Sequence, residues 1–203
     1  MSKLFLSSSF KDVVSVFARF AGDTQGKRVT FIPTASLVEK VIFYVKSGRK
    51  ALEELGMLVD ELDVSTAAPE EIAGKLAAND YIYVSGGNTF FLLQELKRSG
   101  ADKMIAEQVR AGKLYIGESA GAMVASPDIA YASVMDSVKK APLLGGFDSL
   151  HLTDFYTVPH HGNAPFKKAV EKIIEQYGAS LALRPISNKE AVLVDGDTVN
   201  TTL

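Results

Sequence analysis

The feature that most constrains the fold is a regular alternation of short apolar runs with longer amphipathic runs. In the first 120 residues, runs with the length of strands lie at 3–8, 27–36, 57–64, 81–87 and 113–119. Runs with the length of helices lie between them, at 11–21, 38–56, 68–79, 88–100 and 101–112. Because repeated strand–helix units build parallel sheets, this pattern predicts an α/β fold with a mostly parallel sheet and helices on both faces.

The chain after residue 128 follows a less regular pattern. Residues 150–159 predict a strand and residues 164–178 a helix, whereas residues 180–203 predict two or three short strands joined by turns. The "DGDT" stretch at 195–198 makes the last of these a hairpin. No repeat, low-complexity segment or linker divides the sequence, so we expect one α/β domain over residues 1–203.

Composition excludes several classes of protein. The net charge is -2 and the sequence has no dense basic stretch, so we do not expect a nucleic-acid partner. The chain has no cysteine, which excludes a disulfide framework, a thiolate nucleophile and a cysteine metal site. No segment approaches the roughly 18 apolar residues of a membrane span, and the first apolar run is too short for a signal peptide. We therefore expect a cytoplasmic protein with no membrane partner, no metal and no cofactor, and the oligomeric state stays open.

Three of the predicted strands end in small polar residues. These ends are "PTAS" at 33–36, "SGGN" at 85–88 and "GES" at 117–119. Ligands of open parallel sheets bind outside the carboxyl ends of the strands, where such ends meet. The sequence therefore predicts a functional site along this edge.

The third of these ends carries the strongest single motif. The run "YIGESAGAMV" at 115–124 places Ser119 between Gly117 and Gly121, after a strand-like stretch and before a helix-like one. Gly-x-Ser-x-Gly at a strand-to-helix corner is the nucleophile elbow, in which a tight turn exposes the serine hydroxyl near the helix N-terminus. The alternative is a tight turn in which the serine merely caps the helix.

A serine nucleophile needs a base, and the chain has three histidines. His160 and His161 follow Pro159 at the end of the predicted 150–159 strand, which places them near the edge that carries Ser119. His151 lies at the start of that strand and is expected at its far end. We favour His160, because it is closer to the strand, over His161; a pair of solvated loop histidines is the alternative.

The base in turn needs an acid that orients it. Asp136 lies between Ser119 and His160 in the sequence and is the preferred candidate. Glu118 is adjacent to the serine, but neighbouring side chains at a tight corner tend to point apart. Two further aspartates, Asp154 in the histidine strand and Asp128 after Pro127, can instead face a helix or cap a turn.

The "VSGGNTFFLL" run at 84–93 predicts a group of exposed backbone donors. Gly86 and Gly87 follow a buried strand, and Asn88 or Thr89 caps the helix that begins there. Paired glycines allow an N–H to turn outward, as an oxyanion hole requires, or they can cradle a phosphate. Because neither a Gly-x-Gly-x-x-Gly nor a Gly-Lys-Ser/Thr motif follows, nucleotide binding is disfavoured.

Taken in order, "SGGNTFFLL", "GESAGA" and "PHHGN" resemble the motifs of the peptidase E family, serine peptidases that include aspartyl dipeptidases and cyanophycinases. The resemblance spans roughly residues 1 to 200 and implies a class I glutamine amidotransferase-like fold with serine in place of cysteine. It implies Ser119 as the nucleophile, His160 as the base and Asp136 as the acid. It also implies that the N–H groups of Gly87 and Ala120 hold the oxyanion.

The sequence departs from the aspartyl dipeptidases after the histidine. Those enzymes are expected to carry an arginine there, on a longer loop that recognises the aspartate of the substrate. Here a helix follows almost at once, and Lys167 and Lys168 are the nearby cations. Lysine does not replace the bidentate fork of arginine, so we expect Asn88, Lys167 and Lys168 to bind substrate with weak or no preference for N-terminal aspartate.

The sequence therefore favours a serine peptidase that hydrolyses small peptides through Ser119, His160 and an acid. An esterase or amidase of α/β-hydrolase type is a second hypothesis, disfavoured because only 41 residues separate the serine from the histidine. A non-catalytic binding module that keeps the corner is a third, which the missing arginine makes credible.

Overall fold

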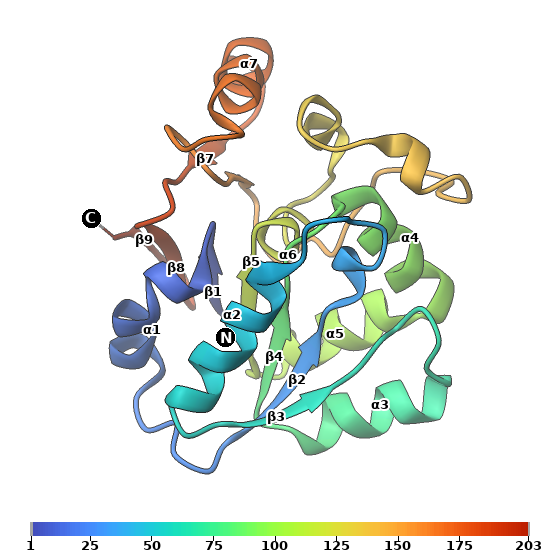
Figure 1. The fold of residues 1–203 in the computed structure, drawn as a ribbon, viewed down its shortest axis with the longest axis vertical. Helices are drawn as coiled ribbons and strands as arrows, with labels where there is room; N and C mark the ends of the chain where they lie inside the picture. Colours follow the sequence, from blue (N-terminus) through green and yellow to red (C-terminus); the bar gives the residue numbers. More distant parts are fainter. Residues whose placement is uncertain (1, 203) are drawn as a thin grey trace.

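A seven-stranded sheet forms the centre of the structure, a computed structural model that describes residues 2–202 (Figure 1). Its strand order is β3-β2-β4-β5-β1-β8-β9. The strands are β1 (Lys3–Ser7), β2 (Arg28–Ile32), β3 (Leu58–Glu61), β4 (Tyr81–Val84), β5 (Leu114–Glu118), β8 (Ala191–Asp195) and β9 (Thr198–Thr201). The first five pair in parallel, whereas β8 and β9 add two antiparallel strands. Two short strands, β6 (Tyr156–Val158) and β7 (Leu183–Pro185), form a separate parallel pair.

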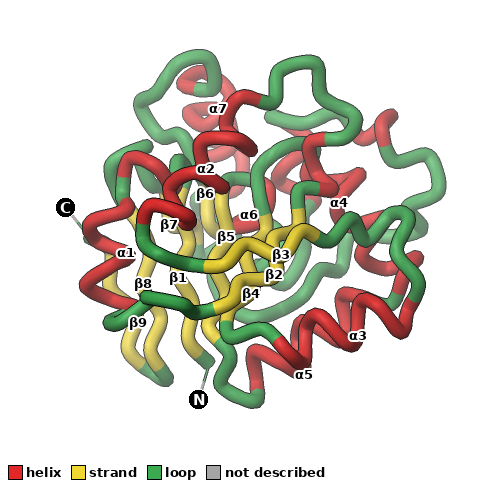
Figure 2. The backbone as a smooth tube through the Cα atoms, turned by 60° about the horizontal axis from the view of Figure 1, so that its bottom comes forward, coloured by secondary structure: helices red, strands yellow, loops and turns green. Residues whose placement is uncertain are grey.

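Helices cover both faces of the large sheet (Figure 2). They are α1 (Val14–Ala21), α2 (Phe43–Glu54), α3 (Pro69–Ala78), α4 (Thr89–Ser99), α5 (Ala101–Arg110), α6 (Ala120–Met123) and α7 (Lys167–Tyr177). Side chains of α1 and α2 share one core with the sheet, and those of α3, α4 and α5 share the other. The predicted fold class, a mostly parallel α/β sheet with helices on both faces, is confirmed.

The strands of the sheet divide their side chains between these two cores. On β1, Phe5 packs with the α1 and α2 side, whereas Leu4 and Leu6 pack with the opposite side. On β4, Tyr83 packs with the α1 and α2 side and Val84 with the opposite side. Because successive side chains of a strand point to opposite faces, a strand buried on both faces is a continuous apolar run, as the sequence shows.

Two predicted elements are shorter in the structure than in the sequence analysis. The helix expected over 38–56 begins at Phe43, because residues 37–42 cross the carboxyl edge of the sheet, where Glu39 pairs with Lys140. The strand expected over 150–159 is reduced to Tyr156–Val158. Residues 150–153 instead donate their backbone N–H groups to carbonyls at 124–126. The predicted C-terminal hairpin is confirmed as β8 and β9.

Among residues 2–202, no helix is both long and apolar enough to cross a membrane. The helices of the large sheet run back between parallel strands, so the carboxyl ends of β2, β4, β5 and β1 lie along one edge. Helix α7 and the loops around β6 and β7 lie beyond this edge, at the top of Figure 1. This arrangement places the three polar strand ends together, as the sequence predicted.

Candidate active site

A cavity of about 670 Å³ opens at the carboxyl edge of the sheet. Seven of the residues singled out in the sequence line it, namely Gly86, Gly87, Asn88, Glu118, Ser119, Asp136 and His160. Its volume falls in the roughly 300–1,000 Å³ range of small-molecule and peptide sites. The cavity therefore lies at the edge of the sheet where the sequence predicts a functional site.

Ser119 lies at the corner between β5 and α6 in a backbone conformation that few residues adopt. Its φ is 49° and its ψ is -107°. A Cβ at Gly117 would lie 2.6 Å from the Gly121 carbonyl oxygen, and one at Gly121 would lie 2.1 Å from that of Val84. Both flanking glycines are therefore required, because the corner packs backbone against backbone.

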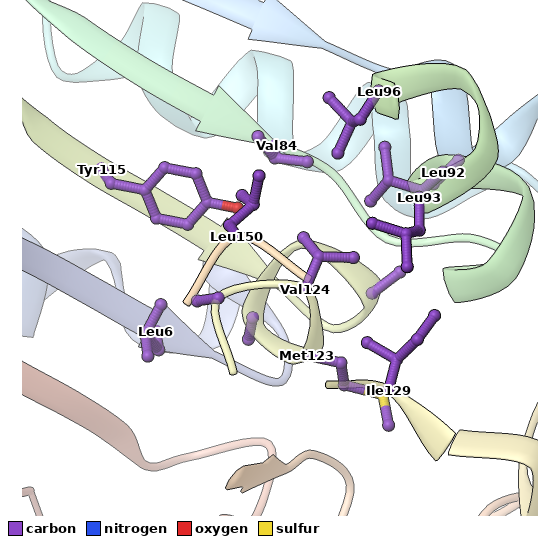
Figure 3. Close-up of a cluster of buried hydrophobic side chains, with 14 of the residues drawn as sticks. Leu6, Val84, Leu92, Leu93, Leu96, Tyr115, Met123, Val124, Ile129 and Leu150 are labelled. Carbon is purple, nitrogen blue, oxygen red and sulfur yellow. The ribbon is translucent and has the colours of Figure 1, made fainter. Parts of the chain in front are cut away.

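The short helix behind the corner is fixed by apolar packing. Met123 and Val124 lie among side chains of β1, β4, β5 and α4, including Leu6 and Val84 (Figure 3). The hydroxyl of Tyr115, on β5, donates a 2.7 Å hydrogen bond to the carbonyl of Gly121. A strained residue persists only where its surroundings hold it, and this packing does so for Ser119.

His160 lines the same cavity and meets the serine there. Its Nε2 lies 2.9 Å from Ser119 Oγ. The backbone N–H of His160, which has a φ of 66°, donates to Ser8 Oγ at the end of β1. Its ring stacks on Phe166 with 4.8 Å between ring centroids. The structure thus brings together the predicted nucleophile and the predicted base, and it aims the base through Nε2.

The partner of the other ring nitrogen is Asn188, which the sequence analysis did not single out. Asn188 Oδ1 lies 2.8 Å from His160 Nδ1, and the backbone N–H of Asn188 donates to Asn163 Oδ1. A carbonyl oxygen accepts but does not donate, so this contact places the ring proton on Nδ1 and leaves Nε2 free to accept a proton from Ser119. Burial lowers the pKa of His160, and the hydrogen bond to Asn188 opposes that shift.

The structure does not bring Asp136 to His160, contrary to the expectation from the sequence. Asp136 Oδ2 accepts hydrogen bonds from the backbone N–H of Thr89 at 2.9 Å and from Thr89 Oγ1 at 2.5 Å. The carboxylate therefore sits at the N-terminus of α4, where the helix dipole favours negative charge. Burial nevertheless raises the pKa of Asp136.

The other acids considered in the sequence are also committed elsewhere. Asp154 is fully exposed, and its Oδ1 lies 3.3 Å from Nε2 of His151. Asp128 accepts from the backbone N–H of Ala130 and from the Tyr156 hydroxyl. Neither is therefore placed to orient the base.

Glu118 is buried directly before the serine and points away from it. Its carboxylate accepts from the backbone N–H of Phe10 at 2.8 Å and from the Tyr83 hydroxyl at 2.7 Å. Burial raises the pKa of Glu118 to about 7, against the two hydrogen bonds, which lower it. Glu118 thus ties β5 to β4 and to the turn after β1.

The two backbone N–H groups of the oxyanion hypothesis belong to Gly87, which lines the cavity with Ser119, and to Ala120, which follows Ser119 in the chain. Gly87 has a φ of 140°, and a Cβ there would lie 2.2 Å from the backbone of Ala35. Ala120 is the first residue of α6. Neither N–H has an acceptor among residues 2–202. Both therefore remain available to a negatively charged oxygen.

The predicted substrate-binding residues separate into two groups. Asn88 lines the cavity, but its Oδ1 caps α4 through the N–H of Phe91 and its Nδ2 donates to Ser137. Lys167 and Lys168 are exposed on the first turn of α7 and are not among the described residues that line the cavity. Lys11 and Lys140 line it instead.

No group of three or more potential ligand side chains within residues 2–202 is arranged to hold a metal ion.

Fold and site together define an α/β protein whose buried strand-to-helix corner presents a serine to a histidine. The sequence profile of Peptidase family S51 matches residues 2–202. The chain therefore belongs to peptidase family S51, which makes it a peptidase by family.

Several relatives span nearly the whole chain. An uncharacterized peptidase of Listeria innocua, Lin0382, is 61% identical over 203 residues, which is 100% of this chain and 97% of the relative. A solved structure of a putative peptidase E protein from Listeria monocytogenes is 59% identical, covers 100% of this chain and 98% of its own, and superposes with a TM-score of 0.97. Peptidase E of Salmonella typhimurium is 35% identical over 148 residues, 71% of this chain and 60% of that protein.

Proposed function

We propose that this protein is a serine-type peptidase that hydrolyses small peptides. Ser119 is the nucleophile, His160 is the base and Asn188 orients the base. The observation that carries the proposal is the 2.9 Å contact between Ser119 Oγ and His160 Nε2 at a strained corner. A nucleophile and base within hydrogen-bond reach, with the base oriented by a third group, is the general arrangement of nucleophilic hydrolases.

The geometry supports a two-step reaction. Ser119 Oγ attacks the carbonyl carbon of the peptide bond while its proton passes to His160 Nε2, and the Gly87 and Ala120 N–H groups bind the resulting oxyanion. The C–N bond then breaks, and His160 returns the proton to the departing amine. In the second step water attacks the acyl-enzyme, again losing its proton to His160, and the acid product leaves.

Asn188 gives this site a neutral third member. An amide carbonyl selects the productive tautomer of His160, as a carboxylate would, but it adds no negative charge opposite the imidazolium that forms during the reaction. Burial lowers the pKa of His160, and a neutral amide opposes that shift less than a carboxylate would. We infer a base that stays neutral, and so active, below the ordinary histidine pKa of about 6.5.

The cavity also supports a weak or absent preference for N-terminal aspartate. Lys167 and Lys168 lie outside the described lining. Of the lysines in the lining, Lys140 pairs with Glu39 at 2.7 Å and Lys11 lies 3.8 Å from Asp12. A carboxylate of a substrate would therefore meet only cations whose charge is already offset by a neighbouring acid.

Labelling with a fluorophosphonate tests the function, because this probe reacts with an activated serine whatever the substrate is. We expect wild-type protein and the Ser133→Ala control, which alters an exposed serine, to be labelled to the same extent. Ser119→Ala should not be labelled, and it should lose peptide hydrolysis by on the order of 10⁴-fold or more. Folded wild-type protein that resists labelling would favour a non-catalytic binding module.

A further inference from the structure

The wall of the cavity next to the serine is apolar. A Cβ at Gly86 would lie 3.2 Å from Ser119 Cβ and 3.5 Å from Cε2 of Tyr44, so only glycine separates the tyrosine ring from the nucleophile. The ring of Tyr44 meets that of Phe43 edge to face, with 5.9 Å between centroids, and Val41 lines the cavity beside them. We call Val41, Phe43 and Tyr44 the apolar wall.

This wall belongs to the most exposed apolar stretch of the described chain. Val41 is 61% exposed and Phe43 is 64% exposed, and their neighbours Leu37 and Ile42 are also open to solvent. Large apolar side chains gathered at the mouth of a cavity mark a binding surface, since exposing them to water is unfavourable. Glu39, in the same segment, pairs with Lys140 and holds the segment against residues 137–140.

The charges of the cavity disfavour an acidic occupant. Its lining contains four carboxyl side chains, Asp12, Glu39, Glu118 and Asp136, and two lysines. Both lysines already lie close to carboxylates, Lys140 at 2.7 Å and Lys11 at 3.8 Å. Burial, together with the nearby carboxylates of Glu39, Glu118 and Asp136, raises the pKa of Tyr44 to about 12. An uncharged side chain avoids the repulsion that an aspartate or glutamate side chain would meet here.

The orientation of His160 decides which part of a peptide meets the apolar wall. His160 must protonate the departing amine, so the leaving residue lies on its side of the cavity, next to Phe166. The acyl residue then lies on the side of Gly86 and Tyr44. We propose that the apolar wall is the subsite for the acyl residue and that it selects substrates with a large uncharged apolar residue there.

This inference rests on the proposed function, so the first test measures binding without turnover. Calorimetry with the Ser119→Ala variant compares the dipeptides Leu-Ala, Phe-Ala, Ala-Ala and Asp-Ala, in which the first residue is the acyl residue. We expect Leu-Ala and Phe-Ala to bind at least tenfold more tightly than Asp-Ala, with Ala-Ala between them. Equal or tighter binding of Asp-Ala would overturn the proposal even if Ser119 reacts with fluorophosphonate.

The second test assigns the preference to the wall. In otherwise wild-type protein, Phe43→Ala should lower kcat/KM for Phe-Ala about tenfold, mainly by raising KM, and change Ala-Ala less than twofold. The matched control is Leu58→Ala, which removes a similar exposed apolar side chain (53% exposed) on the edge strand β3. It should change neither substrate.

Two outcomes of these assays would contradict the assignment. If Phe43→Ala lowered kcat/KM equally for Phe-Ala and Ala-Ala, the wall would act on the fold of the site and not on the acyl residue. If Phe43→Ala instead affected Ala-Phe and spared Phe-Ala, the wall would hold the leaving residue. If wild-type protein were not labelled by fluorophosphonate but Ser119→Ala still bound Leu-Ala and Phe-Ala selectively, the proposed function would be rejected. The apolar wall would then still be a binding site for the apolar residue.

Discussion

The two halves of the candidate active site are built in different ways. Ser119 and its proposed oxyanion donors follow the neighbouring strands β4 and β5 of the central sheet, and the corner is held by backbone packing at Gly117 and Gly121. His160 and Asn188 lie on loops that follow the short strands β6 and β7, which form a sheet of their own. These loops are joined to the large sheet through Ser8, whose Oγ accepts from His160 N–H and donates to the Ile186 carbonyl.

This difference separates what local sequence encodes from what long-range contact supplies. The corner follows from a motif of five residues, because the two glycines allow the close packing of the backbone and the serine supplies the reactive hydroxyl. The base half depends on residues 28 positions apart that meet only when β6 pairs with β7. Substitutions of the closely packed Gly117 or Gly121 should therefore disrupt structure, whereas substitutions of His160 or Asn188 should change the reaction and leave the fold intact.

The largest expected effect separates the two adjacent histidines. His160→Ala removes the group 2.9 Å from Ser119 Oγ and should lower kcat/KM by on the order of 10⁴-fold. His161 is exposed and contributes its backbone N–H to Ile186, so His161→Ala should stay within about twofold of wild type. Peptide hydrolysis assays on both variants check this. If His161→Ala were inactive and His160→Ala active, His161 and not His160 would be the base.

The next effect tests the corner itself. A methyl group at Gly121 would meet the Val84 carbonyl oxygen at 2.1 Å, and a backbone atom in a central strand cannot yield. Gly121→Ala should lower the free energy of unfolding by about 3 kcal/mol and abolish labelling of Ser119. Gly145→Ala is the control, since no atom lies within 4 Å of its Cβ position. Urea denaturation compares them, and equal stabilities would show that the corner tolerates a side chain.

The buried carboxyl group of Glu118, next to Ser119 in the chain, should make the stability of the protein depend on pH. The folded protein keeps its carboxyl protonated up to a pKa of about 7, whereas an unfolded chain releases that proton near 4.5. The free energy of unfolding should therefore fall as the pH rises between these values, by ~3 kcal/mol from this group, and level off above them. Glu118→Gln should lack this contribution.

Urea denaturation of wild type and Glu118→Gln at pH 5 and pH 8 measures the effect. Glutamine keeps an acceptor for the Phe10 N–H, so the variant can retain the local structure. We expect wild type to lose stability relative to the variant between the two pH values. Parallel changes in both proteins would mean that Glu118 is ionised in the folded state at pH 5.

A smaller effect tests the neutral partner of the base. Asn188→Asp places a carboxylate beside His160 Nδ1, which should raise the pKa of His160 and move the acidic limb of the kcat/KM profile to higher pH. A charge-assisted hydrogen bond to the imidazolium should also raise the plateau rate about tenfold. Asn163→Asp adds the same charge one contact further out and should do less of both. Identical effects of the two variants would show that only net charge matters.

How far the sequence predicts this protein depends on the range of the contacts. The parallel sheet, its helices, the final hairpin and the serine corner all follow from patterns within about 20 residues. The 150–159 strand was predicted too long because its first residues pair with the loop after α6, which periodicity does not reveal. The apolar residues at 38–42 fit the pattern of a helix because the exposed wall of a cavity has the same composition as a buried helix face.

The partner of the base illustrates the same limit. The sequence predicts an acid between Ser119 and His160 as this partner, whereas the structure has Asn188, because chain order does not reveal which loop meets His160 Nδ1. A signal was present, since "SNKE" at 187–190 gives β7 a polar carboxyl end like those of β2, β4 and β5. Asp136 satisfied the sequence pattern, yet its carboxylate is used at the N-terminus of α4.

The most direct test of the account is the protonation state of His160, read by nitrogen-15 NMR of histidine-labelled protein. The chain has three histidines, so the His160→Ala variant assigns the resonances. Above pH 7 the account predicts a neutral ring with its proton on Nδ1, held by Asn188, and a bare Nε2 facing Ser119. It predicts a titration midpoint below the ordinary value of about 6.5. A proton on Nε2 in the neutral ring would contradict it, because that histidine could not accept the proton of Ser119.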